Sequence, residues 1–445
     1  MCSRVLYFID IELLAIFTGS YFRFIIINKL SKSKLSRTSL RNTSQYNLPK
    51  CLSKRIKGMS SSRIMCRLRG YALTRNPRTV RRFVSVDSQY FVQCPVTEIQ
   101  LKKPVQLAGR KYLPGSFNLG FPEQLSNPRE GFPLVLKAKD SDELKNRGVE
   151  FWSDCFGEQI RLLYEDYASG NGTPVAVLVR GLPIRSTKDF SQLVKGLGFE
   201  FFQYQGGGGI RDVVDDFVLT GAGEPKEYSV ELHNDMSYSV DYPSKFMITC
   251  LKKSAFGGET AICNARELMA NLDADLVEKF EAKGVRYLRY ILDQSEGSFN
   301  SWQRSLLTES HEEAERFLAE SGYSFEWDGK NVIYWNDALP TITHPLSGEK
   351  LWFNQAYMSH CSYFKAMPLY EGSELEDEKY PSHTVHADGS AIDLGDVHTI
   401  RCTAWETAVG VSLEESDVLF VDNLAVLHSR LSYDGDRVVR TSILR

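Results

Sequence analysis

Three places in the sequence put a histidine two positions before a carboxylate, a spacing at which both side chains could bind one metal ion. The pairs are His233 with Asp235, His311 with Glu313, and His386 with Asp388. Eight histidines multiplied by the acidic fraction, 56 of 445 residues, give about one such pair by chance. The spacing alone therefore does not identify a metal site, and the surroundings of each pair must distinguish them.

The first pair lies in YSVELHNDMSYSVDYPSKF, residues 228–246, which reads as an extended segment. Alternate side chains leave a strand on the same face, so His233 and Asp235 can approach one ion from one side. The second pair falls in a helical pattern, where residues two apart diverge by about 200°. The third lies in the polar, turn-rich loop HTVHADGSAID. We interpret the second and third pairs as solvated surface.

Two ligands do not fix a metal, and His428 is the best candidate for a third. It ends the apolar run DVLFVDNLAVLH and precedes a polar stretch. Two histidines and one carboxylate on one face of an ion form the facial triad of non-haem Fe(II) oxygenases, which leaves positions open for cosubstrate and dioxygen. Zinc hydrolases also use two histidines and a carboxylate, but commonly on a helix as HExxH, which is absent here.

An iron site of this type must also hold an organic acid, and the far end of a dicarboxylate needs a cation. Arg437, nine residues after His428, is placed to offer a bidentate guanidinium. Arg440 is a second candidate, although an odd number of strand steps turns it to the other face unless a bulge intervenes. Thr260, in the sequence GGET, can add a hydroxyl to the same carboxylate.

The elements that must position these residues follow from periodicity. Three stretches have helical periodicity and end at a glycine that suits a left-handed cap, namely residues 148–170, 264–284 and 309–322. Short strand-like runs lie between and after them, at residues 174–182, 244–254, 258–264, 350–358, 417–428 and 437–445. This order predicts a mostly β protein with surrounding helices, a β-sandwich or jelly roll.

No internal repeat or linker divides the chain after residue 90, so we expect one domain over residues 90–445. The glycine run QGGGGIRD, residues 205–212, looks like a phosphate loop at first sight. It lacks both GxGxxG and the GKS or GKT of such loops. We interpret it as a flexible active-site loop.

The first 89 residues form a basic leader, which we expect to be disordered or a targeting segment. Residues 29–82 contain sixteen Lys and Arg and no Asp or Glu, with many serines, which is typical of a mitochondrial transit peptide. The alternatives are a cytoplasmic protein with a basic tail and a protein anchored to a membrane through its N-terminus. Residues 5–28 contain an apolar run interrupted by Arg23, too short to favour a membrane anchor. Met59 could open a shorter presequence, so the sequence does not decide whether residues 1–58 belong to the mature protein.

The rest of the chain has a different charge. Residues 83–445 contain 35 basic and 54 acidic residues, and such an acidic body argues against a nucleic-acid partner. Nine cysteines are scattered, odd in number and never spaced CxxC. This usage argues against a disulfide framework and a cysteine zinc site, and it fits a reducing compartment.

Several motifs occur together in a fixed order: LHNDMSYS, YPSKFMITC, GGETAICNARELM, THPLSGEKLWFNQ, ADGSAID and DVLFVDNLAVLHSR. Together they resemble the TauD/TfdA family of Fe(II)- and 2-oxoglutarate-dependent dioxygenases, and most closely its SyrP-like and clavaminate-synthase-like branch. The resemblance covers roughly residues 170–445. It implies a double-stranded β-helix (jelly roll) core, with Fe(II) bound by His233, Asp235 and His428. It also implies 2-oxoglutarate bound by Thr260 and Arg437, although the Pro-Arg-Arg cluster of the family is GDRVVR here, which keeps Arg440 a candidate.

The resemblance implies a dioxygenase that uses Fe(II), 2-oxoglutarate and dioxygen, hydroxylates a small organic substrate and releases succinate and CO2. Halogenating relatives replace the carboxylate ligand with a small residue, so Asp235 favours hydroxylation or desaturation. The alternatives are a β-helix protein that binds metal or ligand without turnover and a zinc-dependent hydrolase using the same triad.

The sequence says least about which residues form the substrate pocket. Asn234, Ser237 and Tyr238 flank the first ligands, Arg211 follows the glycine run, and Trp352 and Asn354 lie on a strand that the family places near the pocket. Polar and aromatic groups of this kind suit a small amino-acid-like or carboxylated molecule. The identity of the substrate, the oxidised position and the oligomeric state do not follow from the sequence.

Overall fold

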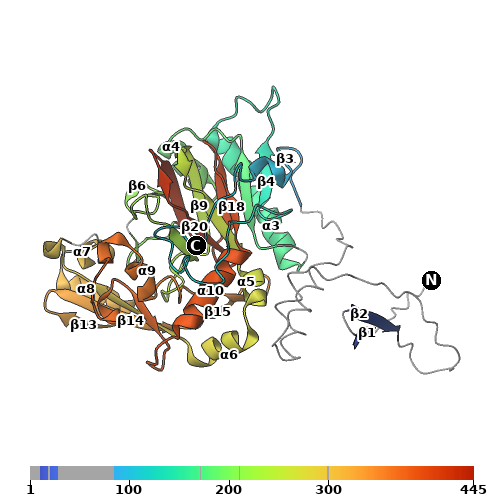
Figure 1. Ribbon diagram of the computed structural model, residues 1–445. Coiled ribbons are helices and arrows are strands. Elements are labelled where there is room, and N and C mark those ends of the chain that lie inside the picture. Colours follow the sequence, from blue (N-terminus) through green and yellow to red (C-terminus); the bar gives the residue numbers. More distant parts are fainter. Residues whose placement is uncertain (1–10, 19–20, 29–84, 171, 210, 298–299) are drawn as a thin grey trace, which may run out of the picture. The chain divides into compact units, whose positions relative to one another are not determined.

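The computed structural model describes residues 11–18, 21–28, 85–170, 172–209, 211–297 and 300–445. The chain divides into two compact units, residues 1–81 and 82–445 (Figure 1), which are considered separately. In the first unit, β1 (Ile11–Thr18) and β2 (Tyr21–Asn28) form an antiparallel hairpin. Most of the predicted leader, residues 1–89, lies outside the described residues, so its targeting role stays a prediction. No helix of the described chain is long and apolar enough to cross a bilayer.

The second unit is built on an eight-stranded sheet, antiparallel except for the parallel pair β4 and β5. Its order is β3 (Phe91–Gln93), β4 (Leu134–Ala138), β5 (Ala176–Arg180), β19 (Val418–Asp422), β9 (Lys245–Lys252), β22 (Val438–Leu444), β7 (Val218–Thr220) and β6 (Val213–Asp215). All five residues of β19 are buried, as expected for a central strand covered on both faces.

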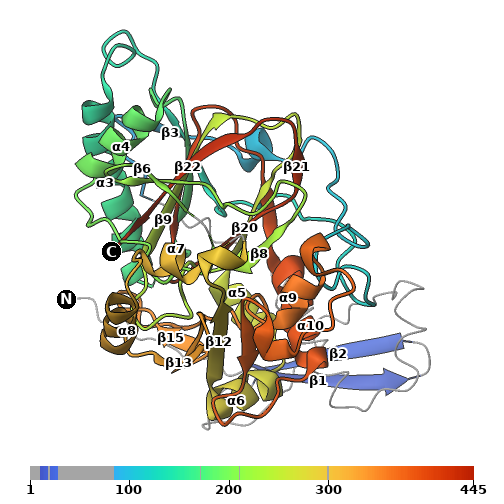
Figure 2. The same cartoon turned by 90° about the vertical axis from the view of Figure 1, so that its left-hand side faces the viewer.

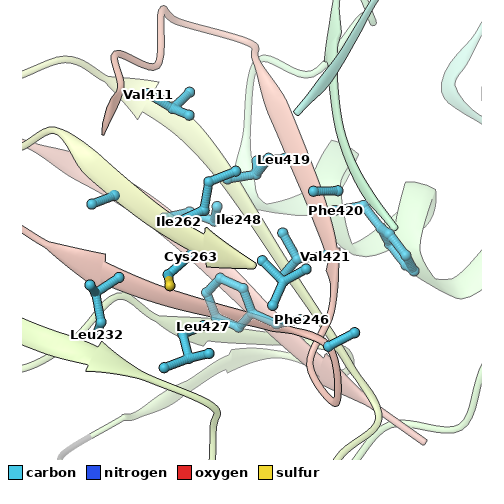
Figure 3. Packing of buried hydrophobic residues seen from close by; sticks show 14 of the residues in the cluster. Leu232, Phe246, Ile248, Ile262, Cys263, Val411, Leu419, Phe420, Val421 and Leu427 are labelled. Carbon is cyan, nitrogen blue, oxygen red and sulfur yellow. The ribbon is translucent and has the colours of Figure 1, made fainter. Parts of the chain in front are cut away.

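A four-stranded sheet faces it, in the order β18 (Val409–Val411), β11 (Thr260–Asn264), β20 (Val426–Arg430) and β8 (Val230–His233). Figure 3 shows apolar side chains of both sheets meeting in the core, with Leu232, Ile262 and Leu427 from the small sheet. Phe246, Ile248 and Val421 come from the large sheet. Two antiparallel sheets packed face to face confirm the predicted mostly β fold with a jelly-roll core.

Helices cover the outer faces of the sandwich. They are α3 (Val149–Ala168), α4 (Thr187–Gly196), α5 (Ala265–Asn271) and α10 (Leu394–Thr407). Helix α6 (Ala274–Lys283) lies instead at the end of the sandwich (Figure 2), where its Phe280 packs on Trp352 and His386. Phe156 of α3 packs on Phe420 of the large sheet, with ring centroids 6.3 Å apart. The predicted helical stretch 264–284 is two helices, because Leu272 and Asp273 have extended backbone between α5 and α6.

A third sheet lies at one end of the sandwich strands (Figure 2). Its order is β13 (Ser324–Asp328), β14 (Asn331–Ala338), β12 (Val285–Ile291) and β17 (His383–Val385). Nearby are helices α7 (Trp302–Leu306), α8 (His311–Glu320) and α9 (Cys361–Lys365), and the 3-10 turns Gln294–Glu296, Pro368–Tyr370 and Asp377–Lys379. Trp302, Leu318 and Tyr334 belong to a second apolar cluster here, separate from the main core.

The remaining short elements are two-stranded ladders and one turn. They are β10 (Phe256–Gly257) with β21 (Tyr433–Asp434), β15 (Thr341–Thr343) with β16 (Lys350–Trp352), and the 3-10 turn Val96–Ile99. The first ladder joins the loop after β9 to the loop before β22, and therefore holds the chain shortly before Arg437.

Candidate active site

His233 is the last residue of β8, and Asp235 lies in the turn that follows it. This differs from the predicted continuous strand, because Met236 has a left-handed backbone with φ 53°. Asn423, between β19 and β20, holds Asp235 on both sides of its backbone. Its Oδ1 accepts from the Asp235 N–H at 2.7 Å, and its Nδ2 donates to the Asp235 carbonyl at 3.0 Å.

His428 lies on β20 directly opposite His233 in the ladder between β20 and β8. Its ring stacks on Phe246 of the large sheet, with centroids 3.9 Å apart and planes inclined by 13°. The two histidine rings have centroids 4.5 Å apart. The jelly roll thus brings together two residues that are nearly two hundred positions apart in the chain.

The three side chains, here called the triad, converge on one buried point. His233 Nε2 lies 3.5 Å from Asp235 Oδ1, and His428 Nε2 lies 3.7 Å from Asp235 Oδ2. One ligand atom from each residue lies within 4.8 Å of the others. Metal bonds to imidazole and carboxylate are about 2.0–2.2 Å long, so these atoms can surround one ion after small adjustments.

The hydrogen bonds of the two imidazoles leave lone pairs for a metal. His233 Nδ1 lies 2.8 Å from the carbonyl oxygen of Glu231, which can only accept, so Nδ1 carries the proton and Nε2 is free to ligate. Both ring nitrogens of His428 are buried and have no hydrogen-bond partner. Buried polar atoms are nearly always satisfied, and an imidazole ligates through one nitrogen. A metal ion therefore fits as the partner of His428 Nε2, which lies 3.7 Å from Asp235 Oδ2.

Arg211 supplies the positive charge beside Asp235. Its two terminal nitrogens donate to the two carboxylate oxygens at 2.9 and 2.8 Å, and both side chains are almost fully buried. Burial by itself raises the pKa of Asp235, but Arg211 and the two imidazoles outweigh it and lower that pKa below its usual range. Burial also lowers the pKa of His428 well below its ordinary value, with His233 adding to the effect. The carboxylate is thus charged and His428 neutral, as ligation requires.

A small pocket of about 40 Å³ adjoins the triad between the two sheets. His233, His428, Thr260 and Arg437 are among the residues that line it. The Thr260 hydroxyl is buried without a partner. Arg437 forms no ion pair with a carboxylate of the described residues, and burial, followed by the nearby Arg430, lowers its pKa. An unpaired guanidinium and an unpaired hydroxyl in one pocket fit the carboxylate of a bound acid.

Arg440, the second candidate for this carboxylate, points elsewhere. Its Nε donates to Thr187 Oγ1 of α4 at 2.9 Å, and it does not line the small pocket. Arg437, Val439 and Thr441 all line it, so alternation along β22 turns Arg440 to the outer face of the sheet. The shift in register between Val438 and Val439 does not change this outcome. The prediction of Arg440 as a cofactor-binding residue is therefore wrong.

A larger cavity of about 970 Å³ opens on the other side of His233 and Asp235. Its walls come from the glycine run, the end of β8, the third sheet and the segment around α9. Among its lining residues are Tyr204, Gly208, Arg211, Glu224, Tyr238, Arg289, Gln355 and Tyr363. Its volume is that of an ordinary small-molecule site.

Residues 173–443 match the family model described as "Taurine catabolism dioxygenase TauD, TfdA family". This match covers more than half of the chain. The chain belongs to the TauD/TfdA family. Its members are Fe(II)- and 2-oxoglutarate-dependent dioxygenases, so the protein is an oxidoreductase that uses Fe(II), 2-oxoglutarate and dioxygen and hydroxylates a small molecule.

Two relatives are similar to this chain in sequence. The chain is 28% identical over 273 residues to dapdiamide synthesis protein DdaC of Enterobacter agglomerans, covering 60% of this chain and 82% of the relative. It is 30% identical over 281 residues to a clavaminate synthase-like protein of Arabidopsis thaliana, covering 61% and 81%. Among solved structures, PvcB of Pseudomonas aeruginosa is 13% identical and has a TM-score of 0.39, covering 74% of this chain and 92% of PvcB.

The predicted substrate residues of the TauD/TfdA domain divide into two groups. Arg211 and Tyr238 line the large cavity. Asn234, Ser237 and Asn354 are buried and do not. The side-chain amides of both asparagines donate to backbone carbonyls, at 2.6 Å for Asn234 and 2.8 Å for Asn354, so they hold the scaffold. This geometry favours a scaffold role for the two asparagines over the predicted substrate role, and the substrate role of Ser237 stays a prediction.

Further residues, from distant segments of the chain, also line the large cavity and were not predicted from the sequence. Arg289 of β12 is the most informative, because it is charged and only 4% exposed. A signal for it exists in VRYLRYI, where strand alternation puts Arg289 on the same face as the buried Val285, Tyr287 and Ile291. Gln355 also lines the cavity, and its Nε2 donates to the Asn234 carbonyl at 2.6 Å.

A second buried group of metal-binding residue types, here called the α9 cluster, consists of His360, Cys361 and His383. The Nδ1 atoms of both imidazoles accept backbone N–H groups, from Ser362 at 3.2 Å and from Cys361 at 3.4 Å. In a neutral ring the proton then lies on Nε2, which leaves no lone pair for a metal. Burial raises the pKa of the Cys361 thiol to about 12, so it is not a thiolate.

The other two histidine–carboxylate pairs are not brought to any metal-binding group of the described residues. His311 and Glu313 are exposed at the start of α8, as predicted. Asp388 is also exposed, but His386 is fully buried, which corrects the surface interpretation for that residue. Its Nδ1 lies 3.2 Å from the Gly284 carbonyl, and its ring packs on Phe280 with centroids 5.2 Å apart.

Proposed function

We propose that His233, Asp235 and His428 are the iron ligands of this dioxygenase. The convergence of the three side chains, with both ring nitrogens of His428 buried and unpaired, carries this assignment. Two neutral imidazoles and one carboxylate on one face match the facial triad of Fe(II) oxygenases. A zinc hydrolase with the same three ligands has no specific support in the geometry.

We further propose that Arg437 and Thr260 bind the distal carboxylate of 2-oxoglutarate in the small pocket. The unpaired guanidinium and the unpaired hydroxyl lie in the pocket that His233 and His428 also line, which supports this placement. A guanidinium offers two parallel N–H groups to a carboxylate, and the hydroxyl adds a third donor. Ser429 also lines the pocket and has a buried hydroxyl without a partner.

The chemistry of the site is the insertion of one oxygen atom into a substrate C–H bond, while 2-oxoglutarate takes the other and becomes succinate and CO2. Bound Fe(II) supplies the activation of dioxygen. The chain's own residues position and shield this chemistry. Asn423 fixes Asp235, the Glu231 carbonyl sets the His233 tautomer, and Phe246 covers one face of His428 against water.

We propose that the substrate is a small amino-acid-like or carboxylated molecule, hydroxylated by the enzyme. The cavity is lined by cationic, acidic and tyrosine side chains, including Arg289, Glu224 and Tyr238, which supports a polar substrate. One carboxylate oxygen of Glu224 is buried and has no hydrogen-bond partner.

The iron and cosubstrate assignments are tested by anaerobic visible spectroscopy. Protein mixed with Fe(II) and 2-oxoglutarate is expected to show the weak charge-transfer band of the chelate, and His233→Ala to abolish it. His311→Ala, in one of the rejected pairs, is the matched control and should retain the band. Wild-type protein that shows neither the band nor 2-oxoglutarate-dependent succinate formation would contradict the proposal.

We also propose mitochondrial import, on the composition of residues 29–82 alone. Residues 1–89 fused to a fluorescent protein are expected to direct it to mitochondria, and residues 59–89 test the shorter presequence. Diffuse cytoplasmic fluorescence of both fusions, or fluorescence at a membrane outside mitochondria, would contradict this proposal.

A further inference from the structure

Three cationic side chains line the large cavity, and two of them already have a carboxylate partner. Arg211 is paired with Asp235, and Lys379 is paired with Asp328 at 2.5 Å. Arg289, by contrast, forms no ion pair with any carboxylate in the described parts of the chain, although it is only 4% exposed. A buried cation without a counter-charge is costly, so its environment needs explanation.

Tyrosines surround the guanidinium of Arg289. The guanidinium carbon lies 3.9 Å from the ring centroid of Tyr238, a cation–π contact. Burial lowers the pKa of Arg289, but Tyr238, Tyr334 and Tyr323 outweigh it, so the pKa is raised above its ordinary value. The side chain therefore stays cationic, and aromatic faces support the charge without neutralising it.

The glycine run leaves room beside this guanidinium. A Cβ atom on Gly208 would lie 2.7 Å from Nη1 and 2.9 Å from Nη2 of Arg289, which real side chains do not tolerate. The Gly208 N–H donates to the Tyr238 hydroxyl at 2.7 Å, which holds the loop against the same tyrosine. The run predicted as an active-site loop is thus packed on Arg289 and Tyr238.

The position of Arg289 relative to the triad suits a small substrate. Tyr238, on which Arg289 stacks, follows Asp235 by three residues, so their Cα atoms are at most about 11 Å apart. Asp235 and Arg289 both line the large cavity. A substrate in this cavity can therefore contact Arg289 and also approach the triad.

We propose that Arg289 binds the carboxylate of the substrate, and that the enzyme acts on carboxylic acids held at the Arg289 end of the cavity. This inference rests on the proposed function, because it assigns the large cavity to substrate and the small pocket to 2-oxoglutarate. A bidentate carboxylate would supply the counter-charge that the chain does not, and the tyrosine cage would fix the plane of the guanidinium.

The test compares acids with their amides. The protein is loaded anaerobically with Fe(II) and saturating 2-oxoglutarate. It is then titrated with the L-amino acids that occur in proteins and with the α-carboxamide of each. Binding is measured by thermal shift and by perturbation of the charge-transfer band. Wild type is expected to bind at least one acid and to bind its amide at least about tenfold more weakly. Arg289→Gln should weaken the acid by a similar factor and so remove the preference, while Arg289→Lys should keep part of it.

Arg286→Gln is the matched control. Arg286 lies on the same strand, three residues earlier, and is paired with Asp337 outside the cavity, so its loss should leave the preference unchanged. The charge-transfer band in Arg289→Gln shows that this variant is folded and loaded. Wild type with a normal band that binds no acid, or acids and amides alike, overturns the inference and leaves the proposed function intact. Wild type without a band overturns both.

Discussion

Two buried clusters in this protein contain side chains of types that bind metals, and they differ in what their ring nitrogens already do. In the triad, His233 donates from Nδ1 to a carbonyl, and His428 has no partner at either nitrogen. In the α9 cluster, His360 and His383 both accept backbone N–H groups at Nδ1. Only the triad therefore has imidazole lone pairs to offer an ion.

The comparison teaches that residue type and burial do not define a metal centre by themselves. Arg401 of α10 makes this plain, because it contacts residues that adjoin both clusters. Its Nε donates to Glu231 Oε1 at 2.7 Å, on the strand that ends in His233, and its Nη2 donates to the Ser362 hydroxyl at 3.3 Å beside the α9 cluster. One buried cation thus supports a scaffold with two histidine groups, and the backbone hydrogen bonds decide which group can ligate.

The largest expected effect is on metal binding. His428→Ala is expected to lose Fe(II) and all activity. Loss of a residue that only hydrogen-bonds to a metal ligand already lowers metal affinity about 10- to 100-fold, and loss of a ligand itself costs more. His383→Asn, the matched change in the α9 cluster, should retain one equivalent of Fe(II). Metal content after anaerobic desalting measures both. Retention of iron by His428→Ala together with its loss in His383→Asn would reverse the comparison.

The second effect is on stability, through the cation that both clusters share. Arg401→Met leaves the fully buried Glu231 carboxylate without its ion pair, because Trp405 is then its remaining donor. Breaking a buried pair on one side costs about 3–5 kcal/mol of unfolding free energy, measured by chemical denaturation. Arg161→Met, which removes an exposed ion pair on α3, should cost less than about 1 kcal/mol. Equal losses would show that Arg401 is not a buried support.

The fold could be predicted from the sequence where one face of an element is apolar. The helices over 148–170 and 309–322 and the strands around 174–182 and 244–254 are confirmed. The run 417–428, predicted as one strand, instead forms β19 and the first part of β20 in different sheets, because the chain turns at residues 423–425. Helix α10 was missed because a charged residue, Arg401, lies within its buried stripe. Arg401 and Trp405 are buried together with Val397 and Ile400, and the helix has no clean polar face to reveal it.

The site could be predicted where its residues are close in the sequence or follow a strong strand. His233 and Asp235 are two apart, and His428 ends an apolar run, so the local sequence pattern was enough to select all three. Arg289 could not be placed beside them, because β12 reaches the cavity only through the packing of the third sheet at one end of the sandwich. The choice between Arg437 and Arg440 likewise needed the observed faces of β22.

The third prediction separates Arg437, which immediately precedes β22, from Arg440 within it. It thereby tests what distinguishes the triad from the α9 cluster, an adjoining pocket for an acid. Arg437→Gln is expected to raise the KM for 2-oxoglutarate about tenfold or more, because a charge-assisted bidentate contact is lost. Arg440→Gln, on the outer face of the same strand, should leave that KM unchanged. Succinate formation over a range of 2-oxoglutarate concentrations measures both, and a larger effect of Arg440→Gln would reassign the pocket.

The smallest expected effect is on the pH dependence of stability, through the neutral histidines of the α9 cluster. Burial, followed by His383 and Arg401, lowers the pKa of His360 to about 3, whereas an unfolded histidine titrates near about 6.5. The unfolded chain therefore binds more protons between these values, so this contribution to stability is complete above pH 6.5 and is lost as the pH falls toward 3.

His360→Asn keeps the side-chain cap of α9, which His360 provides by accepting from the Ser362 N–H, but removes the titrating ring. The unfolding free energy of this variant should fall less steeply with acid than that of wild type, by about 1.4 kcal/mol per pH unit between pH 6 and pH 4. Denaturation curves at several pH values measure the two slopes. Parallel slopes would mean that His360 accepts a proton in the folded protein, and the α9 cluster would then no longer differ from the triad through neutral, hydrogen-bonded rings.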